Sequence, residues 1–374
     1  MSIDWLTRAA PGIADLRPYI PGKPIEELER ELGLAGTIKL ASNENPLGPS
    51  PLAQAAMRKV AADSHLYPDD SGYRLRHIIA ERSGVSADGI TLGAGSSDVI
   101  DMVARVFLHP GVNAVFSRHS FAMYQIYTQA SGAAAKIAAA HAPAHARMPY
   151  GHDLRAMAAL IDAQTRVVFI ANPNNPTGTW LCRGELEWFL QRVPGDVVVV
   201  LDEAYTEYVN EADFPDGVAW LRDYPNLVIT RTFSKMYGLA GLRIGYGIST
   251  AELAAMIQRV RHPFNANLIA LAAAEAALHD EAYVREARAV NEQGMEQLSS
   301  AFDAMGLGYI PSVANFIAVD LGREAAQVNE GLLRRGIITR PIANYSLPNH
   351  LRISIGIEAH NSRFLEALRR ELQA

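Results

Sequence analysis

Hydrophobic residues recur along the chain in two alternating patterns. Residues 196–204 (DVVVVLDEA) and 226–234 (NLVITRTFS) are almost continuously apolar and rich in β-branched side chains. Such runs are typical of strands that are covered on both faces, as in a parallel sheet. Helical segments such as GELEWFLQRV follow or precede them. The alternation predicts an α/β fold whose parallel sheet lies between helices, with further strands at 90–95, 113–117 and 166–173.

The pattern changes after residue 250. Residues 251–305 resemble long helices rich in Ala, Glu and Arg, and the rest of the chain predicts a smaller unit ordered strand, helix, strand, strand, helix. Near the N-terminus, a helix is expected after Pro24, ending at Gly33. We therefore expect an N-terminal arm that packs with the small domain (1–40), a large domain (41–280) and a small α+β C-terminal domain (281–374).

Composition and charge exclude several classes of protein. The chain has 374 residues, a length suited to two domains or to one large domain with a lobe. Its net charge of -6 argues against nucleic acid as the main partner. Its one cysteine, Cys182, permits no disulfide within the chain. No apolar run approaches the ~20 residues of a membrane-spanning helix, and no signal peptide is evident, so we expect a cytoplasmic protein. His141, His145 and His152 lie in a polar loop and are expected at the surface.

Candidate chemistry gathers at the predicted strand ends, where open α/β sheets bind their ligands. The stretch LGAGSSDVI places Gly95, Ser96 and Ser97 between a strand and a helix. Free backbone amides and the helix dipole make such a turn suitable for a phosphate, although a simple capped turn would look the same. Asp98 stands where a dinucleotide motif would have its third glycine, so that alternative is weak.

Two further strand ends carry an amide, a carboxylate and a phenol. In ANPNNPTGTW, Asn175 can donate into the crevice or can simply form a turn. Asp202 follows five apolar residues, and a buried carboxylate of this kind needs a cation. Tyr205 lies three residues further on. A structural ion pair or a metal site with Glu203 is the alternative, but no cluster of histidines or carboxylates supports a metal.

The fourth strand end is TFSKMYGLAGLRIGYG, in which Lys235 follows Thr232 and Ser234. Most lysines are solvated surface charges. A lysine removed from water has a lowered pKa and becomes a nucleophile toward carbonyl groups. Arg243 lies eight residues further on, and a guanidinium can bind a phosphate through two parallel hydrogen bonds.

Together these four strand ends match the needs of one cofactor. Pyridoxal 5'-phosphate requires a lysine for its aldehyde, an acid for its pyridine nitrogen, a donor for its ring oxygen and a cradle for its phosphate. The sequence therefore predicts that Lys235 forms a Schiff base with pyridoxal 5'-phosphate, and it predicts no metal site.

Motifs spread over nearly the whole chain carry a family resemblance: RPYIPGKP, ASNENPLGPSP, LYPDDSGY, LGAGSSDVI, SFAMY, ANPNNPTG, LDEAYTEY, RTFSKMYGLAGLRIGYG, ANF and LRISIG. The chain resembles the class II pyridoxal-phosphate-dependent aminotransferases of fold type I, and among them most resembles the histidinol-phosphate aminotransferases. The resemblance implies a large domain with a mostly parallel seven-stranded sheet and a smaller α+β domain. It also implies reversible transamination between L-histidinol phosphate and 2-oxoglutarate, giving imidazole-acetol phosphate and L-glutamate in histidine biosynthesis, by a homodimer with shared active sites.

The same resemblance implies a role for each candidate residue. Lys235 bonds the cofactor and later moves the proton, while Asp202 pairs with the pyridine nitrogen. Tyr205 and Asn175 bind the ring oxygen, and Phe121 stacks on the ring. The other implied cofactor contacts are Gly95, Ser96, Ser97, Thr232, Ser234 and Arg243, with Tyr67 reaching the phosphate of the neighbouring subunit, and the implied substrate contacts are Tyr19, Asn43, Arg340 and Arg352.

Three alternatives share this frame. An aromatic amino-acid aminotransferase and a phosphothreonine decarboxylase would keep the same lysine, aspartate and arginine and differ in the pocket. A non-catalytic regulatory protein is disfavoured, because Lys235, Asp202 and Arg352 are all present and the net charge is negative.

Overall fold

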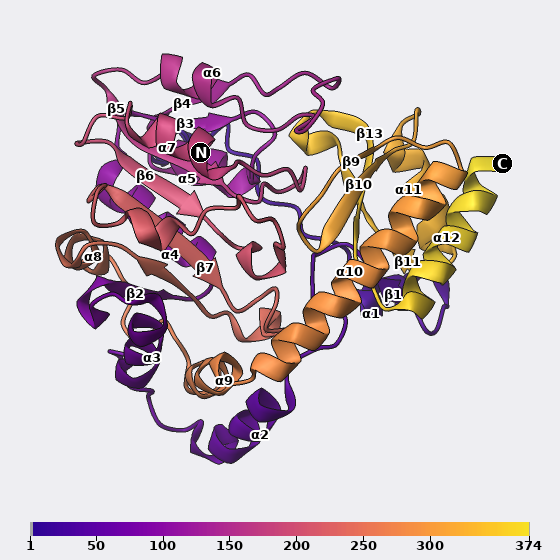
Figure 1. Cartoon of the computed structure of the whole chain (residues 1–374), viewed down its shortest axis with the longest axis horizontal. Helices are drawn as coiled ribbons and strands as arrows, with labels where there is room; N and C mark the ends of the chain where they lie inside the picture. Colours follow the sequence, from indigo (N-terminus) through magenta and orange to yellow (C-terminus); the bar gives the residue numbers. More distant parts are fainter. Residues whose placement is uncertain (1–2, 374) are drawn as a thin grey trace.

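The computed structural model describes residues 3–373, and its larger sheet has seven strands in the order β2-β8-β7-β6-β5-β3-β4 (Figure 1). All neighbouring strands are parallel except at β8, which runs antiparallel to both β2 and β7. This confirms the mostly parallel seven-stranded sheet. The strands are β2 (Ile90–Gly93), β3 (Asn113–Ser117), β4 (Ala134–Ala138), β5 (Thr165–Ala171), β6 (Val198–Asp202), β7 (Leu227–Thr232) and β8 (Gly245–Ile248).

Helices cover both faces of this sheet, which explains the continuous apolar runs of its central strands. Val199 and Leu201 of β6 belong to a core cluster on one face, whereas Val198 and Val200 belong to a cluster on the other. The first cluster includes side chains of α2 (Pro51–Val60), α3 (Tyr73–Ser83), α6 (Leu154–Ala159), α7 (Arg183–Leu190) and α9 (Leu268–Leu278). The second includes side chains of α4 (Ser96–Phe107), α5 (Ala122–Ala130) and α8 (Ala251–Gln258).

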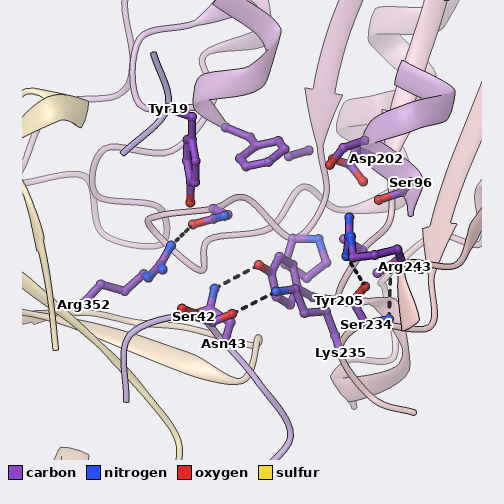
Figure 2. Close-up of a pocket in the computed structure, with 17 residues that line it drawn as sticks. Tyr19, Ser42, Asn43, Ser96, Asp202, Tyr205, Ser234, Lys235, Arg243 and Arg352 are labelled. Atoms are coloured by element: carbon purple, nitrogen blue, oxygen red, sulfur yellow. Dashed lines mark hydrogen bonds between the residues drawn. The ribbon is translucent and has the colours of Figure 1, made fainter. Parts of the chain in front are cut away.

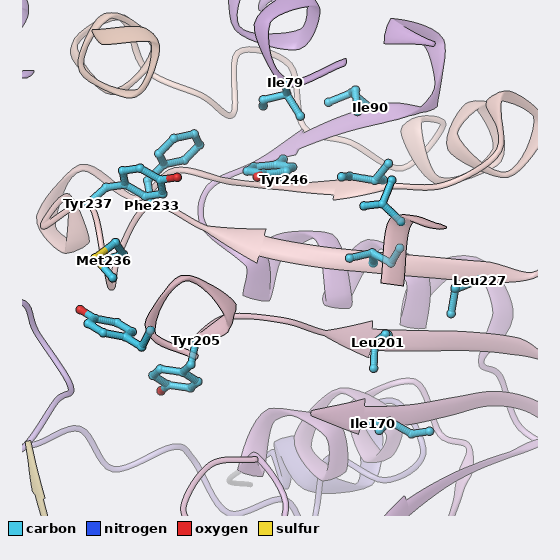
Figure 3. Close-up of a cluster of buried hydrophobic side chains, with 14 of the residues drawn as sticks. Ile79, Ile90, Ile170, Leu201, Tyr205, Leu227, Phe233, Met236, Tyr237 and Tyr246 are labelled. Atoms are coloured by element: carbon cyan, nitrogen blue, oxygen red, sulfur yellow. The ribbon is translucent and has the colours of Figure 1, made fainter. Parts of the chain in front are cut away.

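The register of β5, β6 and β7 aligns the ends of these strands. Asp202 pairs with Ala171 on one side and with Thr230 on the other. Ile170, Leu201 and Leu227 come from these three neighbouring strands, and all belong to the first core cluster (Figure 3). The residues that follow the strands are therefore held at one edge of a rigid sheet.

Strand β8 was not identified from the sequence, because glycines interrupt its apolar pattern. A Cβ atom added at Gly245 would lie 2.3 Å from the backbone nitrogen of Ser96, and one at Gly247 would lie 2.8 Å from the side chain of Val99. Helix α4 therefore packs directly on the backbone of β8, which brings the start of α4 to the edge of the sheet.

A second, antiparallel sheet forms the C-terminal part of the molecule, with the order β12-β13-β10-β9. Helices α10, α11 and α12 pack on it and share its core cluster (Figure 1). The order of strands and helices agrees with the expectation from sequence. The elements are β9 (Tyr309–Ile310), β10 (Phe316–Asp320), β12 (Arg340–Ile342), β13 (Leu347–Ser354), α10 (Glu281–Ala304), α11 (Ala325–Arg334) and α12 (Glu358–Gln373).

The N-terminal segment joins this C-terminal part. Helix α1 (Ile25–Leu32) ends at Gly33, whose φ of 65° gives the left-handed helix terminus expected for glycine. Strand β1 (Ile38–Lys39) then pairs in parallel with β11 (Ile337–Ile338). The division into residues 1–40, 41–280 and 281–374 stays a prediction, and the pairing of β1 with β11 agrees with it.

One histidine differs from expectation. His152 is only 2% exposed, and its Nε2 lies 3.0 Å from the carbonyl oxygen of Ala171. Burial lowers the pKa of this imidazole to about 4. A bridge between Ala140 and His152 folds the loop back toward β5, a tertiary contact that the polar composition of the loop did not indicate.

Within residues 3–373, no helix is both long and apolar enough to cross a membrane.

Candidate active site

A cavity of about 180 Å³ lies at the carboxyl ends of β5, β6 and β7 and reaches β13 of the second sheet (Figure 2). Seventeen residues line it. Most of the residues selected from the sequence meet there, although they come from segments more than 300 positions apart. The selected residues in its wall are Tyr19, Asn43, Ser96, Ser97, Phe121, Asn175, Asp202, Tyr205, Thr232, Ser234, Lys235, Arg243 and Arg352.

The amine of Lys235 points into this cavity. Its Nζ donates a hydrogen bond of 3.0 Å to the carbonyl oxygen of Ser42, and no carboxylate among the described residues forms an ion pair with it. Burial, and after it the charge of Arg352, lowers the pKa of the amine to about 8. With this pKa roughly a tenth of the amine is uncharged and nucleophilic at pH 7, far more than for an ordinary lysine.

Asp202 lies at the end of β6 and is 5% exposed. Tyr124 donates a hydrogen bond of 2.8 Å to one carboxylate oxygen, and Thr230 donates one of 3.0 Å to the other. Burial raises the pKa of the carboxyl group, and these two hydroxyls oppose the rise. Among the described residues the carboxylate has these two hydroxyl donors and no ion pair with a cationic side chain. The predicted pairing of Asp202 with a pyridine nitrogen stays a prediction.

Sequence reasoning missed both hydroxyl donors. Tyr124 lies in α5, three positions after Phe121, and Thr230 lies beside Asp202 in the neighbouring strand. The sheet order would have identified Thr230. The contact of Tyr124 depends on how α5 packs on the sheet, which no local pattern reveals.

Tyr205 is buried beside Asp202. Its hydroxyl accepts a hydrogen bond of 2.9 Å from Nδ2 of Asn43. Burial raises the pKa of the phenol well above its ordinary value, so the hydroxyl stays protonated. Asn43 was selected as a substrate contact; it lines the cavity, but its amide group is bound to Tyr205.

A candidate anion site lies at the start of α4. Gly95 precedes this helix with a φ of 92°, and a Cβ atom there would lie 2.5 Å from Nη2 of Arg243. Arg243 donates to Oγ of Ser234 at 3.4 Å and to the carbonyl oxygen of Ala94 at 3.2 Å. Gly95 does not line the cavity itself, but it makes the close approach of the guanidinium possible. The helix start and the guanidinium together favour a phosphate.

Arg352 of β13 closes the opposite side of the cavity. It is 5% exposed, its Nη2 donates to the carbonyl oxygen of Ala41 at 2.8 Å, and its Nη1 donates to the side-chain oxygen of Asn175. Within residues 3–373 its Nε has no hydrogen-bond partner, and no carboxylate forms an ion pair with it. A buried guanidinium without a counter-charge is suited to bind an anionic ligand.

A model of the family "Aminotransferase class I and II" matches residues 35–368 of the chain. The chain belongs to this family. This match confirms the resemblance seen in the sequence. The buried lysine, carboxylate and arginine of the aminotransferase line one cavity.

Relatives of the aminotransferase are similar over its whole length. It is 57% identical over 374 residues to "Histidinol-phosphate aminotransferase 2" of Pseudomonas fluorescens, covering 100% of this chain and 99% of the relative. A protein of the same name from Pseudomonas aeruginosa is 54% identical, with 98% of each chain covered.

Solved structures agree with the fold. The histidinol-phosphate aminotransferase from Sinorhizobium meliloti, in complex with pyridoxal-5'-phosphate, superposes with a TM-score of 0.87 at 29% identity and with 98% of each chain covered. A Thermus thermophilus aspartate aminotransferase double mutant superposes with a TM-score of 0.82 at 19% identity, covering 97% of this chain and 98% of that chain, which supports the fold alone.

Three selected residues lie outside the cavity wall: Gly95, Tyr67 and Arg340. Tyr67 is 81% exposed, and its ring stacks on Phe264 with the ring centroids 4.5 Å apart. Arg340 lies near the ring of Tyr19, at 5.8 Å from the ring centroid, and donates to the carbonyl oxygen of Ile20 at 2.7 Å. Arg340 therefore holds the N-terminal segment next to the cavity.

No group of three or more His, Cys, Asp or Glu residues is placed to hold a metal ion within residues 3–373. Glu203, which was weighed as a metal ligand, instead forms an ion pair of 2.7 Å with Arg231. The structural ion pair that was the alternative for Asp202 is formed instead by its neighbour Glu203.

Proposed function

We propose that this aminotransferase is a histidinol-phosphate aminotransferase. It transfers an amino group between L-histidinol phosphate and 2-oxoglutarate, giving imidazole-acetol phosphate and L-glutamate, as a step of histidine biosynthesis. One observation carries the proposal: Lys235 and Arg352, two cations without carboxylate partners among the described residues, line one small cavity. The names of relatives that are 54–57% identical support the substrate.

The residues of the cavity fit pyridoxal 5'-phosphate. A Cβ atom at Gly95 would displace the guanidinium of Arg243 from the anion cradle, and the φ of 92° there favours glycine. An amine with a pKa of about 8 suits an aldehyde, and the buried carboxylate of Asp202 suits a pyridine nitrogen. The bound cofactor in the Sinorhizobium meliloti protein supports the same assignment.

When bound, pyridoxal 5'-phosphate stabilises the negative charge that remains after a proton leaves the substrate's Cα. Lys235 would hold the cofactor at its aldehyde, and its amine would take the proton from the substrate's Cα and return it. Tyr124 and Thr230 hold the carboxylate of Asp202 toward the cavity with two hydrogen bonds. Ser96, Ser97, Ser234 and Arg243 would hold the phosphate, with Thr232 accepting from the backbone nitrogen of Ser234 at 3.1 Å.

Substrate recognition is assigned to Arg352. Its guanidinium would bind the carboxylate of glutamate in one half-reaction and the phosphate of histidinol phosphate in the other. Both groups are oxyanions of similar reach, and a planar guanidinium can bind either through paired hydrogen bonds. Tyr19 at the cavity wall and Arg340 beside it would contribute at the entrance.

The active unit is proposed to be a homodimer. Tyr67 lies outside the cavity of its own chain and is highly exposed, as expected for a residue that binds the phosphate in a neighbouring subunit.

A cytoplasmic location is also proposed, because that is where the intermediates of amino-acid biosynthesis are made. Fractionation of cells that produce the protein tests the location.

An absorbance spectrum tests the function directly. Holoenzyme should show a visible band, and L-histidinol phosphate added without a keto acid should abolish it. A band that survives histidinol phosphate but disappears with phenylalanine would assign the protein to the aromatic aminotransferases. Release of CO₂ from phosphothreonine would assign it to the decarboxylases. No band after addition of pyridoxal 5'-phosphate would contradict the role of Lys235.

A further inference from the structure

Residues 40–43 connect the second sheet to the cavity. The backbone nitrogen of Leu40 donates to Ile338 of β11 at 2.7 Å, and its carbonyl oxygen accepts from Ser354 of β13 at 2.9 Å. The segment is therefore fixed to two strands of the C-terminal part before it reaches the cavity.

The next two carbonyl groups of this segment bind the two cations of the site. Ala41 accepts from Arg352 at 2.8 Å. Ser42 accepts from Lys235 at 3.0 Å (Figure 2). Successive residues of one short segment thus contact the lysine and the arginine that the proposed function requires.

Asn43 ends the segment and is 1% exposed. Its backbone nitrogen donates to Oγ of Ser354 at 2.7 Å, and this hydroxyl returns a hydrogen bond of 3.2 Å to Oδ1 of Asn43. Its carbonyl oxygen accepts from Asn315 at 3.0 Å, and its Nδ2 donates to Tyr205 at 2.9 Å (Figure 2). Its φ of 55° is left-handed, a conformation that asparagine tolerates better than most residues.

This network determines the direction of the hydrogen bond to Tyr205. Because the hydroxyl proton of Ser354 is given to Oδ1, the other end of the same amide, Nδ2, is the donor that faces the phenol. Tyr205 accepts there, and within residues 3–373 its own proton is given to no other group. The phenol is thus prepared to donate into the cavity.

We propose that Asn43 is a positioning residue that orients the hydroxyl of Tyr205 toward the ring oxygen of the cofactor, and that Ser354 holds Asn43 in place. The inference deepens the proposed function and rests on it. It replaces direct substrate contact as the main role of Asn43, since all four polar groups of this residue have protein partners.

The experiment is a pH titration of the visible absorbance of holoenzyme. A hydrogen bond to the ring oxygen withdraws electron density and lowers the pKa of the chromophore. Asn43→Ala weakens that bond, so the chromophore pKa should rise by roughly half a unit to one unit, as expected for the loss of one neutral hydrogen bond. An unchanged or lowered pKa would overturn the proposal, and a raised KM with an unchanged pKa would assign Asn43 to substrate binding.

A double-mutant cycle separates positioning from general damage. Tyr205→Phe alone should raise the chromophore pKa, and Asn43→Ala added to Tyr205→Phe should raise it no further. Two additive shifts would show that Asn43 acts without Tyr205 and would overturn the proposal. Ser354→Ala, which keeps the Asn43 amide but removes its anchor, should shift the pKa in the same direction by a smaller amount.

Asn45→Ala is the matched control. Asn45 is also buried, and it donates to Met236 and Tyr283 instead of to groups of the cavity. Its loss should lower the melting temperature and leave the chromophore pKa unchanged. If Asn45→Ala raised the chromophore pKa as much as Asn43→Ala does, the effect would come from general loosening of this segment, and the proposal would be overturned. A protein without a visible band would reject the proposed function and this inference with it, whereas a band with an unchanged pKa rejects only the inference.

Discussion

The chemistry of Lys235 depends on its surroundings. An ordinary lysine is almost fully charged at neutral pH, whereas burial and the nearby guanidinium of Arg352 lower the pKa of this one to about 8. The cavity therefore increases the uncharged fraction of this amine without a neighbouring base.

This property predicts how apoenzyme combines with its cofactor. Only the uncharged amine attacks an aldehyde, so the rate should rise with pH and level off above the lysine pKa of about 8. Stopped-flow absorbance after mixing with pyridoxal 5'-phosphate measures this rate. In Arg352→Met the midpoint should move upward, because a positive charge beside the amine is lost. A midpoint near 10.4, the value of a free lysine side chain, would contradict the prediction.

At the scale of elements, the important feature is the contact between the start of α4 and the backbone of β8. Gly95, with its φ of 92°, and Gly245 allow the helix, the strand and Arg243 to meet at one point. A side chain at either position would push apart the groups that form the anion cradle.

Gly95→Ala should therefore weaken the binding of pyridoxal 5'-phosphate by about ten-fold or more, because the new Cβ displaces Arg243 and strains the backbone. The dissociation constant is obtained from titration of apoenzyme. Gly241→Ala is the control, since no atom lies within 4 Å of its added Cβ. Equal affinities for Gly95→Ala and the natural protein would show that the cradle does not depend on this approach.

The sequence predicted those elements and residues whose signal is local. Lys235 and Asp202 follow continuous apolar strands, so their place at the sheet edge could be inferred from position alone. Strand β8 was missed because its glycines interrupt the apolar run by which a strand is recognised in a sequence. Their role is to let α4 pack closely, which is visible only in the structure. The partners Tyr124 of Asp202 and Asn43 of Tyr205 were missed because these contacts join residues 78 and 162 positions apart. They exist only once α5 and the N-terminal segment have packed.

At the scale of the whole molecule, the proposed site extends beyond one chain. Tyr67 and its stacked neighbour Phe264 are both exposed and lie outside the cavity wall. If Tyr67 serves a neighbouring subunit, each dimer contains two sites, and each site combines groups from both chains.

Mixing two impaired variants tests this arrangement. Lys235→Ala and Tyr67→Ala should each be strongly impaired as pure proteins. Refolded together, they should recover roughly a quarter of the natural activity, because half of the randomly formed dimers have one intact site out of two. Lys235→Ala refolded with Asp202→Ala is the control. In this arrangement each site takes both residues from the same chain, so both sites of every mixed dimer are defective and no activity should return. Equal activities in the two mixtures would place Tyr67 within its own chain.

The segment at residues 40–43 also has a consequence for protein synthesis. Ala41 emerges from the ribosome early, but its partner Arg352 lies 311 positions later. A nascent chain can complete its seven-stranded sheet, with Lys235 in place, well before the arginine proposed to bind the substrate anion is synthesised. Long-range contacts of this kind are formed late. Cofactor capture during translation would thus precede substrate selection, and a prematurely terminated chain would present a reactive lysine pocket that lacks its arginine.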